Sequence, residues 1–272
     1  MSNFSRYSGF LPPSEVREHI ANVFKTFRSW GFTYFKLDGL YFGLQKGRRR
    51  DPEATTVSAF RLLLKTIRDA VPDAVIMGCS EPFLPCLGLI DNARVSNDTS
   101  RYYSGHGTGG AMQLGCSIID AFNISLGNFY TFDRWFRADP DVIMARQDNA
   151  YYSRNEAKFS VLAGIMTGVS LTSDHLGTIN PDRNALLAKA QDIRMRDVLP
   201  YQAMPNFWPR AYEGTINGER AVALVNDTDK PLTWKMADIE MAESCVDLLD
   251  EKTVIHEITL ESHDAVLLVA KK

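Results

Sequence analysis

The sequence of 272 residues is poor in cysteine, and its four cysteines show no paired spacing. Cys79, Cys86, Cys116 and Cys245 form neither C-x-x-C pairs nor a dense scaffold pattern, which argues against a structural zinc site and a disulfide framework. The sequence also lacks any apolar run of the roughly 18–20 residues that a bilayer span needs. The N-terminus lacks a basic head followed by an apolar segment. We therefore predict a cytoplasmic protein with no membrane partner.

An excess of basic residues is also missing. Lys and Arg number 30 against 33 Asp and Glu, so the formal net charge is −3. Nucleic-acid binders need a positive excess to neutralise phosphates, so we expect no nucleic-acid partner. Hydrophobic residues make up 45% of the chain and charged residues 23%, proportions typical of a globular protein with a core. The length suits either one large domain or one large and one small domain.

Short apolar runs alternate with amphipathic segments over about the first 200 residues. Helices are predicted at about 14–29, 54–70, 111–125, 156–167 and 185–198, and strands at about 32–38, 74–79, 93–96, 128–132 and 168–174. Near-continuous apolar strands that alternate with helices indicate a parallel α/β sheet or barrel.

The pattern changes after Pro200. Short strands of alternating apolar and polar residues follow, separated by turns such as Asn217–Gly218. We therefore predict an α/β domain over residues 1–204 and a small antiparallel β-sandwich domain over residues 205–272.

Two ionisable residues close the first predicted strand, which ends Lys36-Leu37-Asp38. Alternation along a strand places Lys36 and Asp38 on the same side, with Asp38 at the carboxyl tip, where barrel enzymes carry their catalytic groups. Burying a lysine in such a strand costs free energy unless its charge is paired with a carboxylate or serves a function. The pair can therefore serve catalysis, or it can be an ion pair that merely closes the strand.

The next two strands end in Cys79 and in the segment from Arg94 to Asp98. A buried cysteine is usually a small hydrophobe. Arg94 and Asp98 can form an ordinary surface pair, or an acid beside a guanidinium that grips vicinal hydroxyls.

Asp38 and Asp98 together suggest a sharper hypothesis. Alternate strands of a barrel contribute to the same layer, so these two carboxylates are expected to face one another across its mouth. Two carboxylates that flank a sugar perform glycoside hydrolysis, with retention at about 5–5.5 Å separation and inversion at about 6.5–9.5 Å.

Three segments carry a resemblance to a known family. WGFTYFKLDG, GCSEPFLPCLGLIDNARVSNDTS and DRWFRADPDVIMAR are similar to consecutive blocks of the α-galactosidases (melibiases) of glycoside hydrolase clan D, chiefly family 36. The resemblance runs from about residue 14 to the C-terminus. It implies a retaining enzyme that removes terminal α-galactosyl groups from oligosaccharides, without a metal or other cofactor.

The resemblance also implies roles for individual residues. Asp38 matches the catalytic nucleophile and Asp98 the general acid/base. Lys36 matches a residue that binds sugar hydroxyls, Cys79 a residue that lines the pocket, and Arg94 a residue that holds the sugar near its 2-hydroxyl.

The sequence departs from the family pattern in two places and in extent. Ala138 stands where the family commonly has Asn, and Ser173-Asp174-His175 stands where Ser-Asp-Asp is common. Asp174 can contact substrate or cap the next segment. The family has an N-terminal β-domain and an eight-stranded barrel, whereas this chain starts just before the fourth barrel strand. We expect a partial TIM (β/α)8-type barrel of about five βα units, the C-terminal half of the catalytic barrel, followed by the C-terminal β-domain.

Three functions remain open at this point. The first is hydrolysis of α-galactosides, and the second is transfer of galactosyl groups between sugars by the same carboxylates. The third is an inactive half-barrel that binds sugar or a partner chain. A missing N-terminal region or a homo-oligomer whose chains complete one another's barrels would supply the absent strands.

Overall fold

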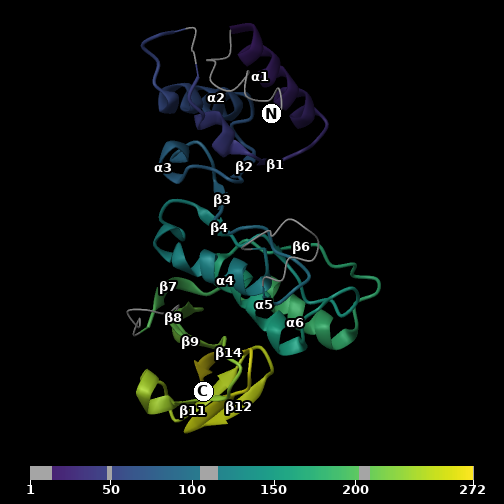
Figure 1. Cartoon of the computed structure of the whole chain (residues 1–272), viewed down its shortest axis with the longest axis vertical. Coiled ribbons are helices and arrows are strands. Elements are labelled where there is room, and N and C mark those ends of the chain that lie inside the picture. Colours follow the sequence, from purple (N-terminus) through teal and green to yellow (C-terminus); the bar gives the residue numbers. More distant parts are fainter. Residues whose placement is uncertain (1–13, 48–50, 105–115, 202–208, 272) are drawn as a thin grey trace. The chain divides into compact units, whose positions relative to one another are not determined.

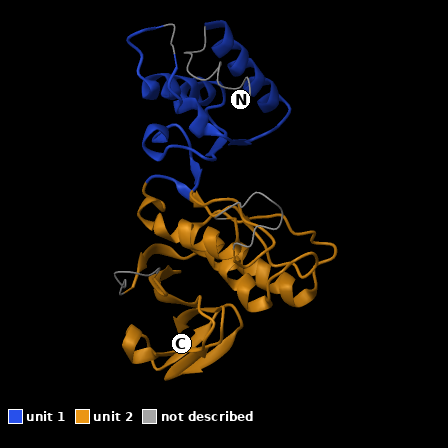
Figure 2. Ribbon diagram, viewed as in Figure 1, with its two compact units in different colours: residues 1–94, 135–137 blue, residues 95–134, 138–272 orange. Residues whose placement is uncertain are grey.

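The computed structural model describes residues 14–47, 51–104, 116–201 and 209–271. The chain divides into two compact units (Figures 1 and 2). Unit 1 comprises residues 1–94 and 135–137, and unit 2 comprises residues 95–134 and 138–272. Within the described residues, no helix is both long and apolar enough to cross a membrane.

Unit 1 is built around parallel strands. Its elements are α1 (Ser14–Ser29), β1 (Tyr34–Leu37), the 3-10 helix η2 (Leu40–Leu44), α2 (Thr56–Ala70), β2 (Val75–Gly78), α3 (Phe83–Cys86) and β3 (Asn92–Arg94). Strands β1 and β2 pair in parallel, as do β2 and β3. The first residue of β4 (Arg137–Asp139) donates its N–H to the carbonyl of Asp91, at 3.1 Å. The predicted parallel α/β arrangement is thus present in this unit.

Helix α2 contributes buried apolar side chains to unit 1. Thr55 caps its N-terminus, where the side-chain oxygen accepts the N–H of Ser58 at 3.0 Å. Phe60 and Leu64 on this helix are buried, as the helical spacing of apolar residues predicted. Strand β1 lies at the end of the strand order, and aromatic side chains nearby in the sequence, Trp30 and Phe32, are exposed.

Unit 2 continues the alternation. It contains α4 (Ile118–Gly127), the 3-10 helix η3 (Phe129–Thr131), the rest of β4, β5 (Val142–Ile143), α5 (Arg154–Thr167), β6 (Leu171–Thr172) and α6 (Pro181–Asp192). Strands β5 and β6 pair in parallel. Helix α5 is buried over its whole length after Glu156, and a capping box of Ser153 and Glu156 closes its N-terminus. Helices α4, α5 and α6 and strand β6 overlap predicted segments, whereas β4 and β5 were not predicted. Closure into a partial barrel stays a prediction.

An antiparallel sheet of eight strands completes unit 2. Its order is β10-β13-β12-β11-β14-β9-β8-β7. The strands are β7 (Arg196–Pro200), β8 (Ala211–Ile216), β9 (Glu219–Asn226), β10 (Leu232–Lys235), β11 (Ser244–Asp247), β12 (Lys252–Ile255), β13 (Glu257–Leu260) and β14 (Asp264–Ala270), with the 3-10 helix η4 (Met236–Ile239) after β10. Val222, Leu224, Val266 and Leu268 belong to its core. The predicted antiparallel β-structure is therefore present, whereas the domain boundary at residue 204 stays a prediction.

Two local predictions were wrong. Residues 129–131 form a 3-10 turn rather than a strand, because the Asn128 carbonyl accepts the N–H and hydroxyl of Thr131. The helix expected to reach residue 198 ends at Asp192. Residues 196–200 instead pair with β8, a non-local contact that local periodicity does not contain.

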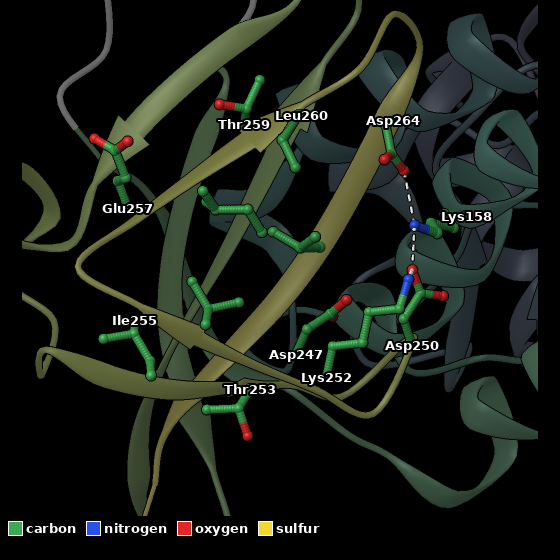
Figure 3. Close-up of a pocket in the computed structure, with 13 residues that line it drawn as sticks. Lys158, Asp247, Asp250, Lys252, Thr253, Ile255, Glu257, Thr259, Leu260 and Asp264 are labelled. Carbon is green, nitrogen blue, oxygen red and sulfur yellow. Dashed lines mark hydrogen bonds and ion pairs between the residues drawn. The ribbon is translucent and has the colours of Figure 1, made fainter.

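A buried cation joins α5 to the antiparallel sheet within unit 2. The Lys158 ammonium is 2% exposed and donates to Asp250 at 2.9 Å and to Asp264 at 2.7 Å (Figure 3). Arg154 also donates to Asp250, at 2.7 Å. A cavity of about 360 Å³ beside this network is lined largely by β12, β13 and β14. Burial alone would raise the pKa of Asp250, but its bonds to Lys158 and Arg154 hold that pKa below its ordinary value.

Replacing Lys158 with Met should lower the free energy of unfolding by about 3 kcal/mol, because the largely buried Asp264 loses its cation and Asp250 keeps only Arg154. Asp250 contributes stability above its unfolded pKa of about 3.9, and this contribution is lost as the pH falls through the lowered folded pKa. The acid-induced loss of stability should therefore be shallower in the variant. Urea unfolding from pH 3 to pH 7 measures both effects. Equal stability of the two proteins at neutral pH would contradict the assigned role.

Candidate active site

The carboxyl ends of three neighbouring strands bring the predicted residues of unit 1 together. Leu37 of β1 is opposite Gly78 of β2, and Gly78 is opposite Ala93 of β3. The residues that follow or end these strands are Asp38, Cys79 and Arg94, so they lie side by side at one edge of the sheet. Carboxyl ends of parallel strands are where α/β folds place ligands.

The carboxylate of Asp38 is held in its ionised form. The Cys79 thiol donates to it, and the Gly39 N–H donates to Oδ1 at 2.7 Å. Lys36 and Arg94 add positive charge nearby, and these effects together lower the pKa of Asp38 although partial burial opposes them. Asp38 is exposed, so its oxygens are accessible to a ligand. An accessible carboxylate that stays ionised is suited to act as a nucleophile.

The backbone after Asp38 is arranged to present that carboxylate. Gly39 has φ of 68°, a left-handed conformation that glycine adopts without steric cost. The following N–H of Leu40 then donates to the carbonyl of Cys79 at 3.2 Å, and that of Tyr41 to the carbonyl of Ser80 at 2.7 Å. The chain end of β1 is thereby fixed against the chain end of β2.

The Cys79 thiol is buried and remains protonated. Burial and the bond to Asp38 raise the pKa of Cys79 to about 11. It acts here as a hydrogen-bond donor to a carboxylate, which is a more specific role than that of a small apolar side chain.

Alkylation of Cys79 by iodoacetamide at pH 8 should be about 100-fold slower than alkylation of an unperturbed cysteine, because only the thiolate reacts. Replacing Asp38 with Asn should speed the reaction, since the carboxylate raises the pKa of the thiol. Mass spectrometry of the peptide that contains Cys79 measures the rate, and Cys116, which is partly exposed, provides an internal control. Labelling of Cys79 as fast as that of Cys116 would be the contrary result.

Asp98 belongs to unit 2, where it is exposed on the segment that follows β3. The Val95 N–H donates to the carbonyl of Asp139 at 2.9 Å, and the Thr99 N–H donates to the carboxylate of Asp141 at 2.7 Å. The Asp-Pro-Asp segment that the resemblance singled out therefore holds the backbone on both sides of Asp98. The predicted placement of Asp98 opposite Asp38 stays a prediction.

Asp174 caps backbone groups. Its Oδ2 accepts the N–H of Ala145 at 2.6 Å and that of Arg146 at 2.9 Å, and the side chain is fully buried. These bonds tie Asp174 to the chain after β5 and not to the segment that follows it, so neither alternative given for this residue is confirmed, and contact with substrate stays a prediction. Ala138, the other departure from the family pattern, is fully buried in β4.

The tyrosines after Asp98 have different environments. Tyr103 is buried, with its ring stacked on His263 at a centroid distance of 4.4 Å. Tyr102 stacks on Tyr151 at 4.9 Å, and Tyr151 is 60% exposed. Tyr103 is therefore a packing residue. His106, in a glycine-rich stretch of sequence, and the basic run Arg48–Arg50 lie outside the described residues.

Four residues predicted for the site lie close together in unit 1: Lys36, Asp38, Cys79 and Arg94. The hydrogen bond from the Thr99 N–H to Asp141 was not predicted. The Asp-Pro-Asp motif was visible in the sequence, although its hydrogen bond to Thr99 spans 42 residues. Within the described residues, no group of three or more His, Cys, Asp or Glu side chains is arranged to hold a metal ion.

The structure of the chain is similar to solved structures of α-galactosidases. The α-galactosidase of Thermus thermophilus in complex with p-nitrophenyl α-D-galactopyranoside is 25% identical, with a TM-score of 0.60 over 77% of this chain and 41% of that enzyme. The same enzyme in complex with stachyose is 26% identical, with a TM-score of 0.57 over 66% of this chain and 38% of that enzyme. The chain thus spans about two fifths of the length of the Thermus enzyme.

A more distant structure supports the fold. The α-galactosidase I of Mortierella vinacea has a TM-score of 0.70 at 15% identity, covering 93% of this chain and 71% of that enzyme. At this identity the likeness concerns the fold alone. No model of a known protein family matches the sequence. The two solved enzymes described above, which this α/β fold and its antiparallel sheet resemble, are both α-galactosidases.

Proposed function

We propose that this chain carries the catalytic carboxylates of a retaining glycoside hydrolase that removes terminal α-galactosyl groups from oligosaccharides. The observation that carries the proposal is the ionised, accessible Asp38 beside Lys36, Cys79 and Arg94 at the carboxyl ends of adjacent parallel strands. The likeness to the Thermus enzyme, which was solved with stachyose and with an α-galactoside, supports the choice of substrate. The proposed family is clan D, family 36, and the proposed extent is the C-terminal half of the barrel with the β-domain.

The proposed reaction has two steps. The Asp38 carboxylate attacks the anomeric carbon and forms a glycosyl ester, while the carboxylic acid of Asp98 gives its proton to the departing glycosidic oxygen. Asp98, now a carboxylate, then takes a proton from water as that water attacks the same carbon and releases Asp38. Two inversions give net retention.

Lys36 and Arg94 are proposed to bind sugar hydroxyls. Both are cationic donors, and Arg94 presents a planar fork that can grip two oxygens. Their charge also stabilises the Asp38 carboxylate before attack. The reaction as proposed requires no metal ion or other cofactor. The cytoplasmic location stays a prediction.

The direct test incubates the whole chain with 4-nitrophenyl α-galactoside and with raffinose. Proton NMR shows which anomer of galactose is released first. If that anomer is α, the result supports a retaining α-galactosidase. A first-formed β anomer would contradict retention, and absence of turnover on both substrates would contradict the activity of this chain. If a sugar acceptor diverts most of the galactose into new oligosaccharides, the enzyme is instead the transglycosylase.

A further inference from the structure

The segment from Val95 to Thr99, which carries Asp98, is anchored at both ends by one turn. At its start the Val95 N–H donates to the backbone carbonyl of Asp139, at 2.9 Å. At its end the Thr99 N–H donates to Oδ2 of Asp141, at 2.7 Å. The five residues from Val95 to Thr99 are thus held at both ends. The two acceptors, Asp139 and Asp141, are only two positions apart in the sequence.

The anchoring turn is itself buried and rigid. Asp139 is fully buried, and Asp141 is 7% exposed. The Asp141 N–H donates to Oδ1 of Asp139 at 3.1 Å, which closes an Asx turn. Pro140 lies between them and restricts the backbone further, since its ring fixes φ.

Asp141 adopts a backbone conformation that glycine would adopt at lower cost. Its φ is 72°, in the left-handed region, where a residue other than glycine pays roughly 1 kcal/mol. Such strain persists only where surrounding contacts impose it, and it clusters at functional sites. The contact that glycine could not supply is the carboxylate bond to Thr99.

A third contact secures the start of the segment. The side-chain amide of Asn128, at the end of α4, donates to the carbonyl of Val95 at 3.0 Å and to that of Ile124 at 3.0 Å. Val95 is therefore held through both its N–H and its carbonyl. At the far end of the segment, next to Asp98, the carboxylate of Asp141 accepts the Thr99 N–H.

We propose that Asp141 is a positioning residue for the general acid/base: by binding the N–H of Thr99, it fixes the backbone on which Asp98 is carried. The inference rests on the proposed function and deepens it. Proton transfer needs the acid within hydrogen-bond reach of the leaving oxygen, and a displacement of about 1 Å can cost about 100-fold in rate. In this proposal Asp141 acts through Asp98 and not on the reacting atoms.

The test compares Asp141→Gly with the wild-type chain. Glycine removes the carboxylate yet accepts the left-handed backbone, so the variant should fold. The matched control is Asp133→Gly, the same change at another aspartate of positive φ, 52°, whose carboxylate pairs with Arg194 at 2.9 Å. Asp141→Asn, whose amide oxygen can still accept the Thr99 N–H, is the conservative variant.

The first readout, hydrogen exchange of the peptide that covers residues 95–103, needs no activity. Asp141→Gly should speed exchange of the Thr99 amide at least about 10-fold, because the amide loses its acceptor. Asp141→Asn should stay near wild type, and Asp133→Gly should leave this peptide unchanged. Unchanged exchange in Asp141→Gly overturns the proposal, whatever the activity of the chain.

The second readout separates positioning from a general loss of structure. With methyl α-galactoside, whose leaving group needs a proton, Asp141→Gly should lose about 100-fold in kcat/KM. With 4-nitrophenyl α-galactoside, whose leaving group needs little assistance, the loss in kcat/KM should stay below about 10-fold. Equal losses on both substrates, or the same pattern in Asp133→Gly, overturn the proposal. If the wild-type chain turns over neither substrate, the proposed function is refuted, and with it the role of Asp141 in catalysis. The hydrogen-exchange result still reports whether Asp141 holds the Thr99 N–H.

Discussion

Replacing Asp38 with Asn should abolish hydrolysis of 4-nitrophenyl α-galactoside, with a fall in kcat of about 10³-fold or more. The amide is nearly the same size as the carboxylate but cannot form the glycosyl ester, so the first step loses its nucleophile. Release of 4-nitrophenol, measured by absorbance, gives the rate. The variant should still bind galactose, because Lys36 and Arg94 are unchanged.

The matched control is Asp73→Asn, the same substitution at an exposed carboxylate of unit 1. Asp73 pairs with Arg28 at 2.7 Å, and that bond lowers its pKa, as the surroundings of Asp38 lower the pKa of Asp38. This variant should keep the wild-type rate. Normal hydrolysis by Asp38→Asn would show that Asp38 is not the nucleophile.

The lowered pKa of Asp38 has a consequence for the pH profile. The Cys79 thiol and the Gly39 N–H stabilise the charged form, so the nucleophile should remain ionised below the ordinary carboxyl pKa of about 3.9. The acid limb of kcat/KM that belongs to this group is therefore expected below about pH 4. Cys79→Ala removes the largest contribution and should move that limb upward.

Replacing Asp98 with Ala should lower the turnover of 4-nitrophenyl α-galactoside by about 10²–10⁴-fold, the range typical of a general acid or base. The leaving group is good enough to depart without a proton, so the glycosyl ester should form and then persist, because no base activates water. A burst of 4-nitrophenol followed by slow release would record this accumulation in stopped-flow absorbance.

Azide provides the sharper readout for Asp98→Ala. It is an anionic nucleophile that needs no base, so it should restore turnover and yield galactosyl azide of retained, α configuration, identified by NMR. Asp38→Asn, which cannot form the ester, should give no such product. If azide leaves the rate of Asp98→Ala unchanged, the role of acid/base belongs to another residue.

Local sequence patterns determined much of the fold. Apolar runs located β1, β2 and β3, and helical spacing located α2 and α5 to within about two residues at their ends. The polar residues at the strand ends were visible in the same way, since a Lys-x-Asp closing an apolar strand is unusual. The regular alternation of strands and helices also predicted that the strands pair in parallel, because two parallel strands must be joined by a crossover connection, usually a helix.

Elements that depend on distant partners were not predictable. Helix α6 ends early, at Asp192, because residues 196–200 pair with β8, and a periodic pattern does not encode that pairing. The 3-10 turn at Phe129–Thr131 has a local cause, the bonds of Thr131 to the Asn128 carbonyl, which a periodic pattern does not encode either.

By itself, the sequence determined most of the alternation of strands and helices in the first 190 residues and identified the residues at the strand ends. It could not decide that the Cys79 thiol donates to Asp38 rather than merely packing, or that Asp174 caps Ala145 and Arg146. Nor could it reveal that Asp141 binds the Thr99 N–H. These outcomes rest on hydrogen bonds between segments up to 42 residues apart, and hydrogen bonds depend on distance and direction, which only the tertiary structure sets.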